Sequence, residues 1–131
     1  MRFNLDKSFG VPEAALHLRA QRTRLIADNL ANSDTPNYKA RDFDFRSAMQ
    51  QAQGQLAPLR TTQPNHLQPA AGDPRNPDVR YRVPLNAAVD GTTVETHAEQ
   101  AKFAENTIHY QATLTVLGAR IQGLMGALRG E

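Results

Sequence analysis

Four histidines are the side chains in this chain that are best suited to bind a metal or to carry a proton. They are His17, His66, His97 and His109. No two of them are three or four residues apart, the spacing that places two ligands on one helix face, and no cysteine is present to complete a zinc set. We therefore expect no metal site, no cofactor and no role for disulfides.

A pair of carboxylates offers a second possibility. Asp42 and Asp44 flank Phe43 and could form an acidic pair. A general acid–base mechanism needs a partner group within hydrogen-bond reach, and no nearby residue supplies a convincing one. Motifs of nucleophile elbows, phosphate-binding loops and dinucleotide-binding folds are also missing. We expect a solvated strand face here and no catalytic residue, so an enzyme is the least expected class.

A basic and aromatic cluster near the middle offers a third possibility, the binding of single-stranded nucleic acid. Aspartates at positions 73 and 78 lower the net positive charge of this cluster, and the formal net charge of the whole chain is only +2. A nucleic-acid-binding module therefore stays an alternative rather than the first expectation. The cluster consists of Arg75, Arg80, Tyr81 and Arg82.

The composition sets further limits. The chain has 131 residues, of which 40% are hydrophobic and 6% aromatic, enough for one modest domain. The segment 1–18 contains four charged residues and no continuous apolar run, so it does not resemble a secretory signal. No stretch approaches the roughly 20 apolar residues that span a bilayer. These patterns predict a soluble chain without a membrane span, although an export route without a cleaved signal would escape them.

The segment between Asn29 and Phe45 must end a helix and turn the chain. Thr35 is disfavoured in the α region because Pro36 follows it. Pro36 and Asn37 suit the centre of a type II turn, where asparagine tolerates the positive φ of the second position. Asp42, Phe43, Asp44 and Phe45 then alternate polar and apolar. This pattern predicts that residues 38–45 form an extended strap, whose two phenylalanines anchor it on a neighbouring helix. The turn and strap motif comprises Asn29, Asn32, Thr35, Pro36, Asn37, Tyr38, Phe43 and Phe45.

Two long helices are predicted at the ends of the chain. The first should begin near Pro12 and end around Asn32. The second should begin at Thr96, with Glu99 completing a capping box, or earlier at Thr92 with Glu95. Apolar residues in the second helix then follow alternating steps of four and three, as in a coiled coil. The assembly seam that we predict comprises Leu16, Thr23, Leu30, Phe103, Tyr110, Leu114, Leu117, Ile121, Leu124 and Leu128.

The segment between these helices has a weaker pattern. Residues 50–57 could extend a short helix from Phe45, and the prolines and glycine of 61–77 predict a loop. Residues 79–83 alternate as a short strand does, with residues 85–89 or 92–96 as the possible hairpin partner. We therefore divide the chain into an N-terminal helix, turn and strap (1–48), a Pro- and Gln-rich middle (49–91) and a C-terminal heptad helix (92–131).

The predicted fold class is mainly α: two long terminal helices form an antiparallel coiled-coil-like pair, with a small irregular or β-containing middle. A second apolar stripe (Ala101, Ile108, Ala112, Ala119) lies beside the seam of the last helix. A helix with two stripes can contact more than one neighbour, which favours assembly with copies or relatives. A helical hairpin complete in one monomer, as in a small adaptor or chaperone, is the alternative.

The turn segment and the last helix together resemble a known family. Residues 22–45, from Arg-Thr-Arg-Leu-Ile-Ala-Asp-Asn-Leu through Thr-Pro-Asn-Tyr-Lys-Ala-Arg-Asp-Phe-Asp-Phe, resemble the N-terminal signature of bacterial flagellar rod, hook and hook-associated proteins. Within that family, residues 99–112 resemble the corresponding segment of the proximal rod members, and the chain is similarly short. Residues 62–67 resemble a segment that recurs in the family. Asn37 is a departure, because the family usually has glycine there, but both residues suit a positive φ.

The resemblance implies a structural role. Such proteins are exported unfolded by the flagellar type III apparatus, without a cleaved signal peptide. They assemble in the periplasm into the basal-body rod, the shaft between motor and hook, and their terminal helices form its inner tube. The implied partners are copies of the chain, other rod proteins, FliE and the export gate, with no nucleic acid and no direct membrane span.

Overall fold

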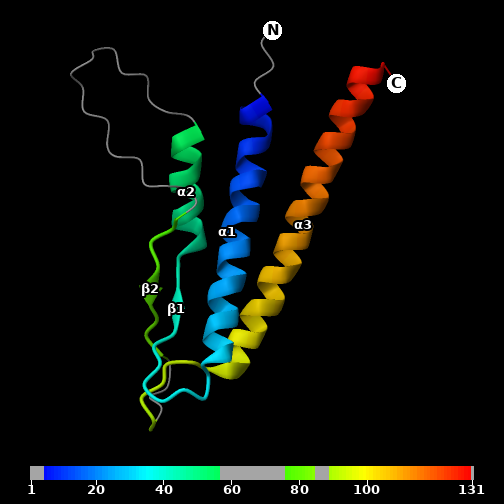
Figure 1. Ribbon diagram of the computed structural model, residues 1–131. Coiled ribbons are helices and arrows are strands. Elements are labelled where there is room, and N and C mark those ends of the chain that lie inside the picture. Colours follow the sequence, from blue (N-terminus) through cyan, green and yellow to red (C-terminus); the bar gives the residue numbers. More distant parts are fainter. Residues whose placement is uncertain (1–4, 57–75, 85–88, 131) are drawn as a thin grey trace, which may run out of the picture.

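The computed structural model describes residues 5–56, 76–84 and 89–130. Three helices account for most of them: α1 (Leu5–Ala31), α2 (Phe45–Leu56) and α3 (Thr96–Arg129) (Figure 1). Two short strands, β1 (Arg41–Asp42) and β2 (Arg80–Tyr81), form an antiparallel pair. The prediction of a mainly α chain with a small β-containing middle is therefore confirmed.

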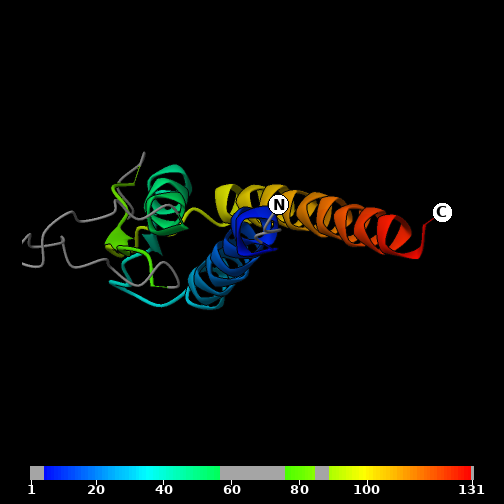
Figure 2. The same ribbon diagram turned by 90° about the horizontal axis from the view of Figure 1, so that it is seen from above.

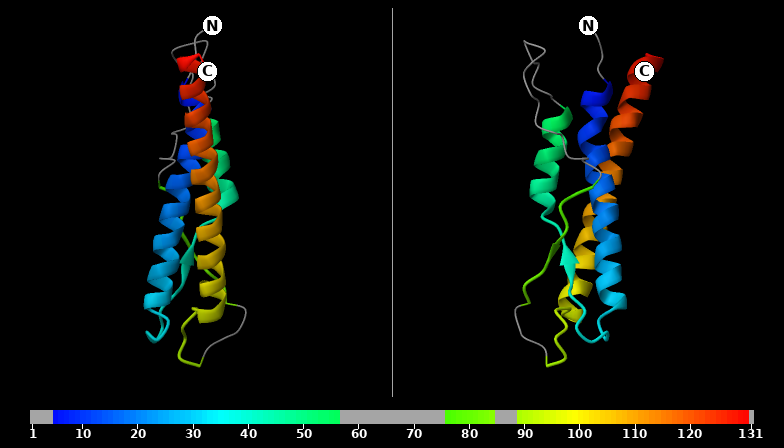
Figure 3. Two further views of the ribbon diagram at one scale, coloured as in Figure 1. Left: turned by 90° about the vertical axis from the view of Figure 1, so that its right-hand side faces the viewer. Right: turned by 60° about the vertical axis from the view of Figure 1, so that its left-hand side comes forward.

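Helix α1 lies between the other two helices, with α2 on one side and α3 on the other (Figures 1 and 2). Helices α1 and α3 run antiparallel and pack closely beside the turn that follows α1. Toward the C-terminal end of α3 the two helices diverge (Figures 1 and 2), whereas they overlap in the views of Figure 3. The antiparallel pair that the sequence predicted is present, but α3 is longer than the part that α1 covers.

Helix α1 begins at Leu5, earlier than the predicted start near Pro12, and ends one residue before the predicted Asn32. Pro12 lies inside the helix and is buried. A proline there leaves the carbonyl four residues earlier without its helical hydrogen bond. The predicted start was wrong because proline suits a first turn without being restricted to one.

The predicted capping box of α3 is wrong, although the helix does begin at Thr96. Glu95 occupies the N-cap position, so the alternative start at Thr92 is wrong too. The Glu99 side chain is fully buried and bonds to Asn29 and Arg82. Its carboxylate serves a tertiary contact and does not cap the helix. At the other end, Gly130 adopts the left-handed conformation typical of a helix C-terminus.

Strand β2 does form in the predicted region, but its partner lies elsewhere. Arg41 pairs with Tyr81 and Asp42 with Arg80, so β2 joins the strap after the turn instead of a local hairpin. The segment 92–94 lies on the strap as well, because Thr93 N–H donates to the Tyr38 carbonyl at 3.1 Å. The other predictions for the middle fall on residues 61–75 and 85–88, which lie outside the described residues. The predicted short helix from Phe45 is confirmed as α2.

A small apolar core joins α1 to α2. Leu18 of α1, Phe43 of the strap and Ala48 of α2 are buried together, and Leu25, Phe45 and Met49 pack against them. The guanidinium of Arg19 lies 4.2 Å from the centre of the Phe45 ring, a cation–π contact. The helix on which the strap is anchored is thus α1 of the same chain.

Candidate functional site

The turn after α1 has the geometry that the sequence predicted. Asn37 has φ of 61°, and Tyr38 N–H donates to the Thr35 carbonyl at 3.2 Å, which closes the turn around Pro36 and Asn37. A second turn packs against it: Asn37 N–H donates to the Asp90 carbonyl at 3.0 Å. Gly91 there has φ of 74°, and a Cβ at Gly91 would lie 2.5 Å from Asn37 Oδ1. The two turns therefore fix how the strap leaves α1 and how the chain enters α3.

Substitutions at Asn37 should act through this geometry. Asn37→Gly keeps the positive φ, whereas Asn37→Val puts a β-branched residue in a conformation that it strongly disfavours, at a cost of about 1–3 kcal/mol. We expect the glycine variant to match the wild type and the valine variant to unfold at a lower temperature. Thermal unfolding of the purified variants tests this. Equal behaviour of the two variants would contradict the turn assignment.

Asn29 connects the end of α1 to the strap and to α3. The side chain is fully buried. Its Nδ2 donates to the Arg41 carbonyl at 2.9 Å and to Glu99 Oε2 at 3.1 Å, and its Oδ1 accepts from Arg41 N–H at 3.0 Å and from the Tyr38 hydroxyl at 3.5 Å. Asn32 stays at the helix end, where its side chain bonds to the Asp28 carbonyl and to Thr35. Of the predicted motif, Asn29 is the residue that holds three segments together.

A chain of charged side chains extends from Asn29. Arg22 of α1 donates twice to Asp42, at 3.2 Å for both contacts, and Arg82 Nη2 donates to the same carboxylate at 2.7 Å. Arg82 also forms an ion pair with Glu99 of α3. We call these five residues, Arg22, Asn29, Asp42, Arg82 and Glu99, the polar junction. It joins α1, the strap, the middle segment and α3.

The electrostatics of Asp42 follow from its neighbours. Burial raises the pKa of its carboxyl, but the hydrogen bonds and charge of Arg22, with hydrogen bonds from Phe43 N–H and Arg82, outweigh burial and hold the pKa below its ordinary value. The carboxylate is therefore charged at neutral pH and balances both arginines. The predicted solvated strand face was wrong for Asp42, whereas the exposed Asp44 accepts from Arg46 N–H and caps α2.

The other candidates for chemistry lie apart from one another. His17 and His109 each lie 3.7 Å from a glutamate one turn away, His97 is exposed, and His66 lies outside the described residues. Within the described ranges no three metal-ligating side chains come together. Of the basic–aromatic cluster, Arg82 is turned inward, whereas Arg80 pairs with the exposed Asp78 and Tyr81 is exposed. Arg75 lies outside the described residues. The three described members of the cluster do not form one shared basic surface.

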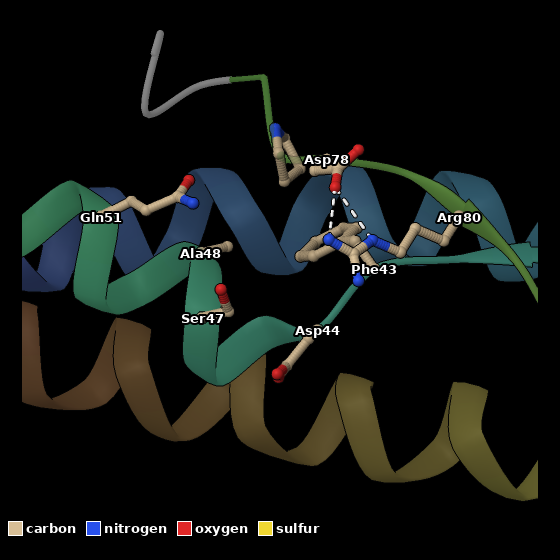
Figure 4. A pocket seen from close by; sticks show the side chains of 8 residues that line it. Phe43, Asp44, Ser47, Ala48, Gln51, Asp78 and Arg80 are labelled. Atoms are coloured by element: carbon tan, nitrogen blue, oxygen red, sulfur yellow. Dashed lines mark hydrogen bonds and ion pairs between the residues drawn. The ribbon is translucent and has the colours of Figure 1, made fainter. Parts of the chain in front are cut away.

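A hollow of about 110 Å³ separates α2 from the segment that leads into β2 (Figure 4). Its lining includes Phe43, Ala48 and Pro77, with Asp78 and Arg80 held together at one side. The described residues around it present no nucleophile with a base beside it. We regard this hollow as a packing gap between α2 and the middle segment.

The predicted seam divides into two rows on α3. Tyr110, Leu117 and Leu124 are half-buried. Leu114, Ile121 and Leu128 are 44%, 43% and 86% exposed, and Phe103 is 37% exposed. The two rows are only about 40° apart on α3, but α1 diverges from α3 and leaves the second row exposed. On α1, Leu16, Thr23 and Leu30 are all half-buried.

The contact between α1 and α3 is polar as well as apolar. Asn106 is 2% exposed, and its Nδ2 donates to the Arg19 carbonyl and to Thr23 Oγ1, both at 2.9 Å. No role for this residue is predicted from the sequence. Glu99, Asn106 and Thr113 follow one another every seven residues, and this polar heptad could have indicated the face of α3 that meets α1.

A shallow apolar groove of about 420 Å³ opens where α1 and α3 diverge. Val11 and Ala15 line it from α1, Ala112 and Val116 line it from α3, and the lining also includes Arg19 and Arg120. At 100° per residue, positions 112 and 116 are roughly opposite positions 114 and 121 on α3. The helix therefore carries two different apolar surfaces, one on each flank.

Comparisons with known proteins agree on one family. Residues 11–39 match the model of a family described as flagella basal body rod protein. The chain is 47% identical to the flagellar basal body rod protein FlgB of Cereibacter sphaeroides over 123 residues, which cover 93% of this chain and 94% of the relative. It is 40% identical to the FlgB of Salmonella typhimurium, with 96% of each chain covered, and 36% identical to that of Escherichia coli, with 95% of each covered.

Proposed function

This chain belongs to the flagellar basal body rod proteins and is a structural subunit of the rod, and we propose that it polymerises through α1 and α3 into a tubular shaft that transmits torque from motor to hook. The observation that carries the proposal is the pair of apolar surfaces on α3. The row of Leu114, Ile121 and Leu128 is exposed on one flank, and the groove beside Val116 opens on the other.

Two different surfaces on one subunit suit a helical assembly. A contact between unlike surfaces repeats from subunit to subunit and produces an open filament when the rotation does not close a ring. Apolar side chains that are exposed together in this way also favour burial against a partner over contact with solvent. The turn, the strap and the polar junction would hold α1 and α3 at a fixed angle, so that both surfaces keep their relative positions.

The finer parts of the proposal rest on family membership. They are delivery through the flagellar type III export apparatus without a cleaved signal peptide, a periplasmic position, and contacts with FliE and the export gate. Among the described residues, no helix combines the length and the apolarity that a membrane crossing requires. A role as a structural subunit rather than a catalyst also fits the names of the relatives.

Deletion of the gene in its own host tests the proposal. We expect cells without motility, whose basal bodies lack the rod and the hook beyond it, and full recovery when the wild-type chain is supplied. The control is a strain complemented with an unrelated exported subunit, which should stay non-motile. Normal basal bodies with complete rods in the deletion strain would contradict the proposed function.

A further inference from the structure

We propose that residues 76–84 form a clasp that must dock before α1 and α3 can pack against each other, and that Arg82 is its essential side chain. Arg82 is the point at which the middle segment enters the polar junction. Its guanidinium binds Asp42 of the strap at 2.7 Å and Glu99 of α3, and only 20% of the side chain is exposed. One arginine therefore connects two carboxylates that belong to distant parts of the sequence.

Glu99 is the residue that makes Arg82 necessary. Its carboxylate is fully buried at the base of α3, where α1 and the strap cover it. Besides Arg82, it receives a hydrogen bond from Asn29 Nδ2 at 3.1 Å and has Lys102 Nζ at 3.7 Å, with the lysine side chain one-third exposed. A buried carboxylate that loses its main cation destabilises a fold strongly. If α1 and α3 closed without the clasp, Glu99 would be buried with an amide and a more distant lysine.

The clasp itself has little else that holds it in place. Val79, Tyr81 and Val83 lie on its outer side and are 40%, 73% and 86% exposed, so their apolar area contributes little to docking. The backbone adds the two paired residues of β2 and the bond from Arg82 N–H to the Ala40 carbonyl at 2.8 Å. Pro77 is buried and lines the same hollow as Phe43. The arginine faces inward and the apolar residues face outward, the reverse of an ordinary two-layer pattern, which indicates that the ion pairs direct docking.

The consequence for assembly rests on the proposed function. A subunit whose clasp is undocked keeps Glu99 in water and α1 apart from α3, so its two apolar surfaces are not held at the angle that a neighbour requires. The clasp would couple docking of residues 76–84 to the packing of α1 against α3. The clasp itself can be tested on the isolated full-length chain without any rod.

The test compares Arg82→Met with Arg80→Met, because Arg80 lies on the same strand but pairs with the exposed Asp78. The readouts are the thermal midpoint and hydrogen exchange of the amides in residues 99–106. We expect Arg82→Met to lower the midpoint by about 10 °C or more and to speed exchange there by roughly 100-fold or more. Arg80→Met should stay within about 2 °C of the wild type.

A second variant distinguishes a clasp from a general loss of packing. Arg82→Met/Glu99→Gln removes the buried charge that Arg82 balances, so it should recover at least half of the lost midpoint and most of the protection of residues 99–106. This variant decides the matter even if Arg82→Met fails to fold. Equal behaviour of the two methionine variants, no recovery in the double variant, or a wild-type chain without protection of residues 99–106 would overturn the clasp. None of these results depends on rods, so they are independent of the test of the proposed function.

Discussion

Replacing Leu114 and Ile121 together by aspartate is expected to abolish rod assembly and motility while the isolated subunit stays folded. Both side chains are more than two-fifths exposed in the subunit, so aspartate there meets water and changes the fold little. In the assembled shaft the same positions would lie under a neighbouring subunit. A buried carboxylate without a partner costs about 3–5 kcal/mol, which weakens each contact by more than roughly 100-fold.

The measurements are swimming in soft agar, recovery of rods from basal bodies, and thermal unfolding of the purified chain. Gln111→Asp with Gln122→Asp is the matched control, because the pair adds the same two charges to a different, exposed face of α3 and should assemble nearly as the wild type does. Leu114→Gln with Ile121→Gln separates loss of apolar area from charge and should give a milder defect. Normal rods from the double aspartate variant would show that this row is not an assembly contact.

Phe43→Ala is expected to give the largest loss of stability of any single substitution in the strap. The ring is 5% exposed and packs with Leu18 of α1 and Ala48 of α2. Truncation of a buried phenylalanine to alanine costs about 3–5 kcal/mol, because the surrounding side chains fill the space only in part. Against the roughly 5–15 kcal/mol that folds a domain, this loss is large, and motility should fall with it.

Thermal or urea unfolding of the purified chain measures the effect, with a lowered midpoint of about 10 °C or more as the expected result. Tyr81→Ala is the control, because this aromatic residue is 73% exposed and its loss should leave the midpoint almost unchanged. A Phe43→Ala variant that unfolds with the wild-type midpoint would mean that the strap does not anchor α2 to α1.

The features that local chemistry determines could be predicted from the sequence. Pro36 followed by Asn37 indicated a turn with a positive φ, and Asn37 has φ of 61°. The heptad spacing from Phe103 to Leu128 indicated one long helix, and α3 spans that whole stretch. In both cases the signal comes from neighbours in the chain, within one turn or one helix.

The polar junction could not be predicted because its members are far apart in sequence. Arg82 was assigned to a possible nucleic-acid-binding cluster and Glu99 to a helix cap, since each residue has a plausible local role. Their actual roles follow from a tertiary contact between residues 17 positions apart, and the bond of Glu99 to Asn29 spans 70 positions. The same reason explains why β2 pairs with the strap after the turn and not with a local hairpin partner. Long-range pairing leaves no periodic signal in a single sequence.

Cryo-electron microscopy of basal bodies isolated from cells that carry this chain as their only copy tests the central claim most directly. The account predicts that density for α1 and α3 lies in the wall of the rod. It also predicts that the row of Leu114, Ile121 and Leu128 is covered by a helix of an adjacent subunit. A rod map in which this row faces solvent, or in which the chain is absent from the rod wall, would contradict the account.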